Sequence, residues 1–430
     1  MRAFSRLLAS LVVLAPLLAA APASAADTPA ENTVAPLPDD FLWGVASSGF
    51  QSEGSNPDSN WLRYSESKEH VGNAVDFRHR YAEDIALAAD MGVEVYRFGV
   101  EWARVEPAPG EWDEAELAYY DDVVRHVLDA GMKPMITLNH WVHPGWVADQ
   151  GGWKSDDTLA DFTAYAERIV QRYADSGAMW VTFNEATLYV YHEIDNGAAT
   201  WFDAPWIFDR IAKAHNAAYD LIHEANPDAM VTSNLAFIPL SPWLFDAAFI
   251  DGIRHRLDFV GIDYYLGLSL DNLTAARAVT GELADAQPDG IYYALRYYAN
   301  KFPDLPLYIV ENGMATHDNA ERPDGLSRTE FIEDHVYWIQ RAAEDGIDVI
   351  GYNYWSLTDN YEWGSYTPRF GLYTVDAVTD PDLVRQPTDG VAAYTGVIAG
   401  GGVPGDYEPV VRESVCSLID PPLSCLVPAA

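Results

Sequence analysis

The sequence predicts an α/β protein built as a single (β/α)8 barrel, the TIM-barrel fold. Its 430 residues, 49% of them apolar, suit one such barrel with insertions. Eight short runs rich in β-branched and aromatic residues alternate with longer amphipathic stretches, as parallel strands alternate with helices. No glycine-rich phosphate loop follows any of these runs, which argues against a doubly wound, nucleotide-binding sheet.

The predicted strands recur along the chain with helix-length spacing. They are residues 41–47, 93–99, 134–139, 179–184, 230–236, 259–265, 306–311 and 349–355. The stretches between them include 77–91, 115–130 and 158–173, in which apolar residues recur at helical spacing. In such a barrel the carboxyl ends of all strands meet at one end, where barrel enzymes place their chemistry.

Residues 1–25 are predicted to be a secretory signal peptide. Arg2 and Arg6 form a basic start, Leu7 to Ala21 is mostly apolar, and Ala23-Ser-Ala25 is a small-residue cleavage sequence. A membrane anchor is the alternative, but the run is short for a span of about 20 residues. We therefore expect an extracellular or periplasmic protein whose mature form does not enter a membrane.

The rest of the chain is expected to be one domain with short additions at each end. Residues 26–37 are rich in Pro, Ala and polar residues and predict a flexible lead-in. The barrel is expected over 38–405, and 406–430 form a C-terminal extension. The extension holds both cysteines, Cys416 and Cys425, which in an exported protein predict a disulfide.

The net charge of the chain limits the kinds of molecule that it is expected to bind. The net charge is −39, from 65 acidic and 26 basic residues spread along the chain. Such a surface repels nucleic acid and anionic membranes, so no nucleic-acid partner is expected. The 14 Trp, 25 Tyr and 16 Phe offer flat faces for sugar rings, although most of them must pack in the core.

Two glutamates end the fourth and seventh predicted strands. Glu185 follows 179–184, and Glu311 ends 306–311. Two carboxyl groups facing one another can cleave a glycosidic bond, because one protonates the departing oxygen and the other attacks or stabilises the anomeric carbon. Taken alone, each glutamate is equally well explained as a structural ion-pair partner, so the surrounding segments decide.

Seven segments resemble, in order, those of glycoside hydrolase family 1, the β-glucosidase-like retaining glycosidases. They are Phe41–Gly54, Tyr96–Trp102, Asn139–Trp141, Thr182–Glu185, Val310–Gly313, Trp355–Trp363 and Arg369–Gly371. The resemblance extends from about residue 38 to residue 376. It implies the barrel fold and retaining β-glycosidase chemistry, with neither metal nor cofactor.

The resemblance also implies roles for individual residues. Glu185 would be the acid/base and Glu311 the nucleophile. Arg97 and Tyr265 match positions that hydrogen-bond the nucleophile, which must be ionised, and Asn184 matches the residue that binds the sugar 2-hydroxyl. The alternative for Arg97 is an ordinary buried ion pair, with the same glutamate as its partner.

A second group matches the residues that hold the nonreducing-end sugar. It comprises Gln51, His140, Trp355, Glu362 and Trp363. A metal site on His140 and His143 is the alternative, which is not favoured because no further His/Cys cluster exists. Trp141, Trp146 and Trp201 either line the aglycone side or serve packing.

Three positions depart from the family pattern. Ala186 stands where a proline usually follows the acid/base. Asp263 stands where asparagine is usual, and as a third carboxylate it would raise its neighbours' pKa values if ionised. Gly364 follows Trp363 without the Ser/Lys pair of the phospho-sugar branch, which implies an unphosphorylated sugar.

The expected function is that of a secreted retaining β-glycosidase acting on a β-linked oligosaccharide or glycoside. Terminal nonreducing β-D-glucosyl residues are the expected substrate, with β-galactosyl or β-fucosyl as side substrates. Glucose and galactose differ at one hydroxyl, which Gln51 and Glu362 can both accept. A transglycosylase on the same site and an inactive carbohydrate-binding protein remain as alternatives, and the oligomeric state is left open.

Overall fold

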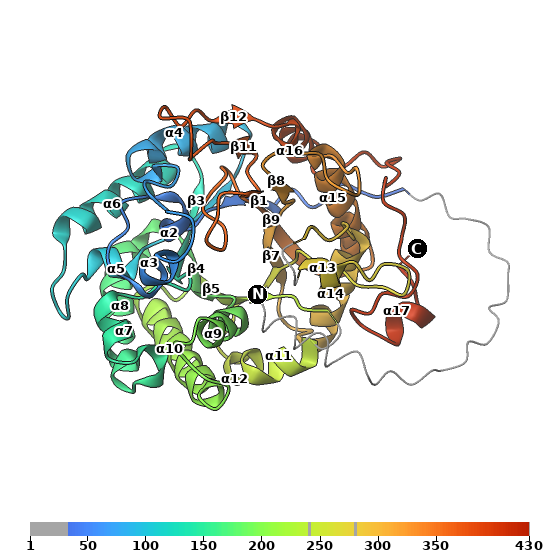
Figure 1. Cartoon of the computed structure of the whole chain (residues 1–430). Helices are drawn as coiled ribbons and strands as arrows, with labels where there is room; N and C mark the ends of the chain where they lie inside the picture. The colour runs from blue at the N-terminus through green and yellow to red at the C-terminus, as the bar shows by residue number, and fades with distance from the viewer. Residues whose placement is uncertain (1–32, 240–241, 279–281, 430) are drawn as a thin grey trace.

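The computed structural model describes residues 33–239, 242–278 and 282–429, which form a closed barrel surrounded by helices (Figure 1). Its eight parallel strands follow the order β1-β2-β3-β4-β5-β6-β7-β9, and β9 closes the barrel against β1. The strands are β1 (Leu42–Ala46), β2 (Val95–Gly99), β3 (Lys133–Asn139), β4 (Met179–Asn184), β5 (Met230–Ala236), β6 (Val260–Asp263), β7 (Leu307–Asn312) and β9 (Val349–Trp355). The predicted (β/α)8 barrel is confirmed, with each strand near its predicted place. The predicted signal peptide lies outside the described residues.

Helices connect the strands and cover the outside of the barrel. The longer ones are α4 (Phe77–Asp90), α6 (Glu114–Asp129), α8 (Asp157–Tyr173), α9 (Ala186–Asp195), α10 (Ala204–Ala225), α14 (Asp289–Lys301), α15 (Arg328–Glu344) and α16 (Asp389–Gly400). The shorter ones are α2 (Gly49–Ser52), α3 (Asn60–Ser65), α5 (Trp102–Val105), α7 (Gly145–Asp149), α11 (Pro242–Ala248), α12 (Ile250–Ile253), α13 (Ala275–Ala278), α17 (Leu423–Leu426) and the 3-10 turns Gly152–Lys154 and Ala174–Ser176. Two small antiparallel pairs join β8 (Thr316–His317) to β10 (Pro368–Arg369) and β11 (Tyr373–Thr374) to β12 (Gln386–Pro387). In α8, Phe162, Ile169 and Tyr173 recur at helical spacing and are buried, which explains why this face packs inward.

The barrel interior is filled by an apolar layer. It consists of Val95, Met135, Met179, Val181, Phe259, Tyr308 and Val310. These residues come from four different strands and, with Phe259, from the position just before β6, and they pack together inside the closed barrel. Their sequence neighbours Tyr96, Trp180 and Ile309 belong to the larger core cluster shared with the helices, as strand alternation requires.

A β-bulge interrupts each of the two strands that lead to a glutamate. In β4 the register passes from Val181 to Asn184 while the partner strand advances only from Thr232 to Asn234. In β7 it passes from Ile309 to Asn312 while the partner advances from Tyr352 to Tyr354. The extra residue reverses the alternation, so that Asn184 and Glu311 face the interior above the apolar layer.

The described part of the predicted lead-in, residues 33–37, is held against the end of the barrel. The backbone N–H groups of Val34 and Leu37 donate to the carbonyls of Gly405 and Gly401, at 3.0 and 2.8 Å. Both side chains are buried. These residues are therefore attached to the barrel by hydrogen bonds and packing.

The C-terminal extension packs over α14 and α15, and Cys416 and Cys425 form the predicted disulfide. Asp334 on α15 accepts hydrogen bonds from the backbone N–H groups of Val410 and Val411, at 2.9 and 2.8 Å. Arg296 on α14 pairs with Asp420 at 2.8 Å. The extension is thereby bonded to two helices of the barrel wall.

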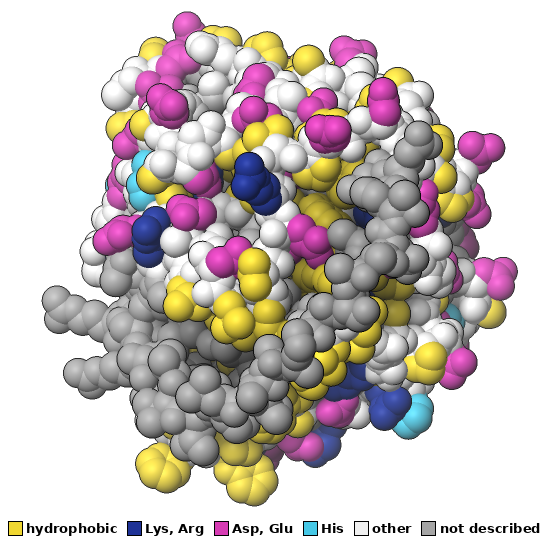
Figure 2. All heavy atoms as spheres, turned by 90° about the vertical axis from the view of Figure 1, so that its right-hand side faces the viewer, with side chains coloured by type: hydrophobic (Ala, Val, Ile, Leu, Met, Phe, Trp, Pro, Cys, Tyr) yellow, Lys and Arg dark blue, Asp and Glu magenta, His cyan; other side chains and the backbone are white. Residues whose placement is uncertain are grey.

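The surface is rich in acidic side chains. Figure 2 shows them spread over one face of the molecule, with fewer basic side chains among them. In the part of the chain that the structure describes, no helix combines the length and apolar character needed to cross a bilayer.

Candidate active site

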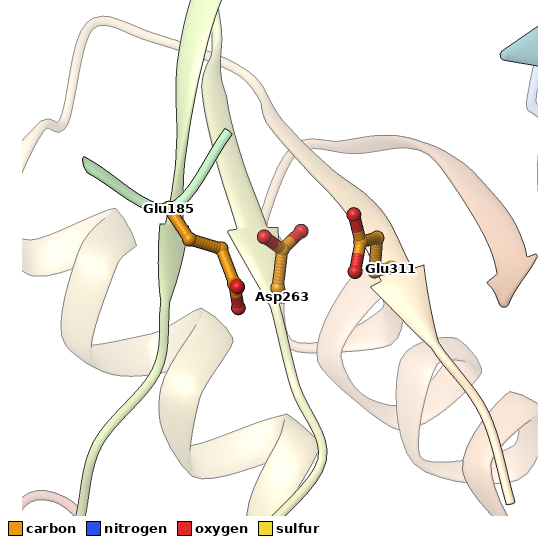
Figure 3. Close-up of side chains that lie close together, drawn as sticks. All are labelled: Glu185, Asp263 and Glu311. Carbon is orange, nitrogen blue, oxygen red and sulfur yellow. The ribbon is translucent and has the colours of Figure 1, made fainter. Parts of the chain in front are cut away.

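Glu185 and Glu311 meet at the carboxyl end of the barrel, where the strand pattern predicted them. Glu185 directly follows β4, and Glu311 lies in β7 beyond its bulge. Both are buried, and Asp263, the last residue of β6, lies between them (Figure 3). One carboxyl oxygen from each of the three lies within 4.8 Å of the other two. This close approach of the carboxyl groups suits the closely spaced pair of a retaining glycosidase.

Glu311 is held by two donors. The guanidinium of Arg97 forms an ion pair with Oε1, and the hydroxyl of Tyr265 donates to Oε2 at 2.9 Å. Arg97 is fully buried and also donates to Thr137 Oγ1 at 3.0 Å and Asn184 Oδ1 at 2.6 Å. A buried cation and a phenol thus bond to the same carboxyl group, one to each oxygen.

The surroundings of Glu185 differ from those of Glu311. No described residue donates a hydrogen bond to its carboxyl group. Burial, and next the negative charge of Glu311, raise the pKa of Glu185 well above the usual range, while Arg97 acts in the opposite direction. Glu185 therefore keeps its proton under conditions in which a free glutamate loses it.

Asn184 links the pair to the predicted sugar-binding residues. Its Oδ1 accepts from Asn234 Nδ2 at 2.6 Å as well as from Arg97, and its Nδ2 lies 3.4 Å from His140 Nε2. The ring of His140 stacks on Trp355 at 5.6 Å between centroids, nearly parallel. Burial, and next the charge of Arg97, hold the pKa of His140 well below its usual range, so this imidazole is neutral.

The remaining predicted sugar residues form one connected group. Trp355 Nε1 donates to Glu362 Oε1 at 2.9 Å, and Gln51 Nε2 donates to the Tyr361 carbonyl at 3.1 Å. Burial raises the pKa of Glu362 to about 7. The indole of Trp363 is 51% exposed, so it lies at the outer edge of this group.

Comparison with known proteins agrees with this geometry. Residues 33–244 and 243–403 match the model of glycosyl hydrolase family 1. The chain belongs to this family. It is thus a glycosidase that hydrolyses O-glycosyl bonds, and its β-strand barrel is that of the family's solved structures.

Several relatives of this family 1 hydrolase have been characterised. It is 29% identical to the aryl-phospho-β-D-glucosidase BglC of Bacillus subtilis, over 85% of this chain and 98% of the relative. It is 30% identical to the chloroplastic galactolipid galactosyltransferase SFR2 of Arabidopsis thaliana, over 78% of this chain and 59% of the relative. The apo structure of β-glucosidase 1317 superposes with a TM-score of 0.72 at 31% identity, covering 85% of this chain and 100% of that one.

Not all predicted aromatic residues of the hydrolase lie near the glutamates. Trp141 donates to the Asn184 carbonyl at 2.9 Å and contacts Trp363 at 5.0 Å between centroids. Trp146 instead packs edge-on against the buried Trp102 and donates to the Glu106 carbonyl at 3.0 Å, so it serves packing. Trp201 is half exposed and contacts Tyr191.

His140 and His143 of the hydrolase have separate environments. His140 faces Trp355, whereas His143 Nδ1 lies 2.8 Å from the hydroxyl of Tyr189. Burial, followed by the charge of Arg63, lowers the pKa of His143 to about 3. His143 is thus a neutral, buried residue whose polar ring atom is satisfied by a tyrosine.

Three non-glycine residues around the site adopt left-handed backbone conformations. Their φ angles are +44° at Glu185, +66° at Trp141 and +52° at Trp363. Such conformations are unfavourable for residues with a Cβ, and they concentrate at functional sites where the surrounding structure enforces them. Ala186, where a proline is usual, begins α9 and is fully buried.

Asn234, for which the sequence predicted no role, contacts two residues of the site. It lies in β5 and donates to both Asn184 and Asp263 through its amide nitrogen. A buried asparagine near the carboxyl end of a barrel strand is the signal that could have identified it.

Proposed function

We propose that this hydrolase is a secreted retaining β-glycosidase that removes terminal nonreducing β-D-glucosyl residues. Glu311 acts as nucleophile and Glu185 as acid/base. The observation that carries the assignment is the difference between the two carboxyl groups. Glu311 is paired with Arg97 and Tyr265, whereas the buried carboxyl group of Glu185 receives no hydrogen bond from any described residue and holds a proton.

These environments support a double displacement. An oxygen of Glu311 attacks the anomeric carbon while Glu185 passes its proton to the departing glycosidic oxygen. The negative charge of Glu311 is lost in the resulting ester, and the carboxylate of Glu185 then takes a proton from the attacking water. Asn184, oriented by Arg97 and Asn234, is placed to bind the sugar 2-hydroxyl in both steps.

The charges near the sugar group favour an unphosphorylated substrate. Glu362 lies buried beside Trp355. The neighbouring Glu69 carboxylate accepts from Ser365 Oγ at 3.0 Å and from the Tyr366 N–H at 2.9 Å, which occupies donors that a phosphate would need. A sugar phosphate would meet carboxylates here, so the expected substrate differs from the one in the name of the Bacillus relative.

A panel of nitrophenyl β-glycosides tests the substrate assignment. We expect hydrolysis of the glucoside, lower rates with the galactoside and fucoside, and no measurable hydrolysis of the glucoside 6-phosphate. Proton NMR of the first product should show the β-anomer, whereas a first-formed α-anomer would contradict the retaining assignment. A protein that binds these glycosides without cleaving them would be a carbohydrate-binding protein.

Azide separates the roles of the two glutamates. Glu311→Ala should abolish hydrolysis of every substrate. Glu185→Ala should still form the intermediate from aryl glycosides with very good leaving groups, because these need little protonation. Azide should then accelerate turnover and give a β-glycosyl azide. Formation of the β-azide by the Glu311 variant would reverse the assignment.

Transglycosylation is the second candidate function. The Arabidopsis relative is named a galactosyltransferase, and the same intermediate can react with an alcohol in place of water. The half-exposed Trp363, with Trp141 against its edge, offers an aromatic face next to the site for an acceptor sugar. Acceptor competition decides between the two, since a transglycosylase gives glycosylated acceptor as the main product at millimolar acceptor.

Secretion is proposed from the sequence of residues 1–25 and is supported by the disulfide, which oxidising compartments favour. Expression of the full chain with a secretion-competent host should release a protein that begins at Ala26 or Asp27. Amino-terminal sequencing of the released protein checks this, and retention of Met1 in the cell fraction would contradict it.

A further inference from the structure

Asp263 occupies the centre of the active site but has no role in the double displacement described above. It is 1% exposed and lies opposite Glu311 in the β6–β7 register, between the two glutamates (Figure 3). Its Oδ2 accepts a hydrogen bond from the amide of Asn234. Its Oδ1, although buried, has no hydrogen-bond partner among the described residues.

The charged groups around Asp263 limit how many carboxyl groups can be ionised together. Glu185 and Glu311 face it as two further acidic groups, Arg97 is the buried cation, and Tyr265 adds a neutral phenol. Arg97 can compensate one carboxylate, and it contacts Glu311. Burial, followed by the charges of Glu311 and Glu185, raises the pKa of Asp263 well above its usual range. An uncharged cluster of these groups therefore contains two protons, one on Asp263 and one on Glu185.

We propose that Asp263 is a second proton-holding carboxyl group of the site, neutral in the free enzyme and in competition with Glu185 for the one negative charge of the covalent intermediate. The proposal rests on the proposed function, in which Glu311 forms the ester and Glu185 loses its proton to the leaving group. The proposal goes beyond that function because it gives the covalent intermediate two protonation forms, and only one of them can be hydrolysed by water.

The two forms differ only in the position of one proton. Directly after the first step, Glu185 is a carboxylate and Asp263 a carboxylic acid. Transfer of the Asp263 proton to Glu185, across oxygens within 4.8 Å or through one water, leaves Asp263 as the carboxylate. No proton enters or leaves the site, and Arg97 compensates either carboxylate. The second form cannot activate water, because Glu185 is then protonated.

Two features favour a substantial share of the unreactive form. Asp263 accepts a hydrogen bond from Asn234, whereas no described residue donates to Glu185. A free aspartic acid is also more acidic than a free glutamic acid, by about 0.4 pKa units. Asparagine at position 263 would keep the shape and remove the competing acid.

The competition makes a quantitative prediction for Asp263→Asn. In the wild type, loss of the first proton from the intermediate is shared between two acids, so its apparent pKa lies below that of Glu185 alone. In the variant every singly ionised molecule is reactive. The plateau rate of intermediate hydrolysis should rise about 2- to 10-fold, and the midpoint of the acid limb should move up by about 0.3–1 pH unit, the logarithm of the same factor. At the acid end the rates of the two enzymes should coincide.

The experiment follows hydrolysis of the 2-deoxy-2-fluoroglucosyl enzyme as a function of pH. Wild type, Asp263→Asn and Asp289→Asn are first trapped, and peptide mass spectrometry locates the label. Asp289 is the matched control, because it is equally buried but lies on α14, where Ser414 N–H donates to it at 3.0 Å. Its variant should give the wild-type profile.

The outcomes separate this inference from the proposed function. A label on a residue other than Glu311 would overturn the proposed function itself. A label on Glu311 with an unchanged pH–rate profile for Asp263→Asn would overturn only the proposed competition between Asp263 and Glu185. A loss of rate in this variant that is uniform and persists at the acid end would overturn it as well. Infrared difference spectra of the free enzyme at neutral pH give a second readout. In the difference spectrum between wild type and Asp263→Asn, the bands of the other protonated carboxyl groups cancel, and one carbonyl stretch should appear as lost in the variant. The absence of such a lost band would show that Asp263 is ionised.

Discussion

The hydroxyl of Tyr265 and the carboxylate of Glu311 are joined by a hydrogen bond of 2.9 Å, on the oxygen opposite the one that Arg97 contacts. Each oxygen of the proposed nucleophile is therefore fixed by one donor. The two donors come from β2 and from the segment that directly follows β6, so the barrel itself sets the direction from which this carboxylate can attack.

Tyr265→Phe should lower kcat/KM by about 10- to 100-fold, because one of the two donors that orient Glu311 is lost. The melting temperature should change little, since the ring and its packing against Phe370 remain. Steady-state kinetics with a nitrophenyl glucoside provide the measurement.

The neighbouring Tyr264 provides the control for this prediction. It is buried and donates to the Gln287 carbonyl at 2.7 Å, away from the glutamates. Tyr264→Phe should cost about 1–2 kcal/mol of stability and leave kcat/KM within about twofold of wild type. Equal kinetic losses in both variants would mean that the effect of Tyr265 is structural.

The pH dependence of kcat/KM should be bell-shaped, with an alkaline limb set by Glu185. Activity requires its protonated form, which is present below its raised pKa and is lost as the pH rises through that value. The alkaline limb should disappear in Glu185→Ala assayed with an aryl glycoside that needs no protonation. If the limb persisted unchanged in this variant, another group would control it.

Stability should fall as the pH rises from about 4.5 to 8. Burial, first of all, raises the pKa of Glu101 to about 8, of Glu193 to about 7 and of Glu362 to about 7. The folded state then binds more protons than the unfolded state in this window. Each such group contributes its full stabilisation at pH values below its unfolded-state pKa, and this stabilisation is lost as the pH rises through its folded-state pKa.

Glu101→Gln checks this dependence. Its Oε1 accepts from the Phe50 N–H at 3.1 Å, a bond that the amide oxygen can keep. The slope of the unfolding free energy against pH should become shallower by up to about 1.4 kcal/mol per pH unit within the window. Chemical denaturation at several pH values measures it, and an unchanged slope would show that Glu101 is ionised when folded.

Raised ionic strength should stabilise the protein. With a net charge of −39, self-repulsion on the surface is screened as salt is added. Many arginines already form surface ion pairs, such as Arg125 with Asp122 and Arg256 with Asp220, and salt weakens these. We expect repulsion to dominate, so the melting temperature should rise between low and about molar salt. A flat or falling trend would mean that the paired charges dominate.

The strands were predicted from local sequence patterns, and the paired glutamates from their strand-end positions together with the family resemblance. Short β-branched runs gave eight strands near their correct bounds, and Glu185 and Glu311 stood at the ends of two of them. Arg97 was predicted from the family resemblance, and the structure places it inside the barrel, two residues after Val95 on the same strand.

Features set by distant contacts were not predictable. The bulges in β4 and β7 depend on pairing with the neighbouring strands, and no residue type in either strand predicts them. The position of Asp263 between the glutamates needs the closed barrel. Trp146 and Trp141 could not be distinguished from the sequence, because both are tryptophans that could line the aglycone side or serve packing. Only the contact of Trp146 with the buried Trp102 shows that it serves packing.

The bulges have a consequence for how this enzyme can be altered. Below them, residues such as Val181 and Val310 fill the barrel with apolar contacts, and above them the backbone itself turns Asn184 and Glu311 toward the substrate. Along β4 and β7, the two bulges therefore separate the apolar layer inside the barrel from the active-site residues above it. A more thermostable variant can be sought by repacking the apolar layer, while the active-site residues keep their alignment and the enzyme keeps its catalytic rate.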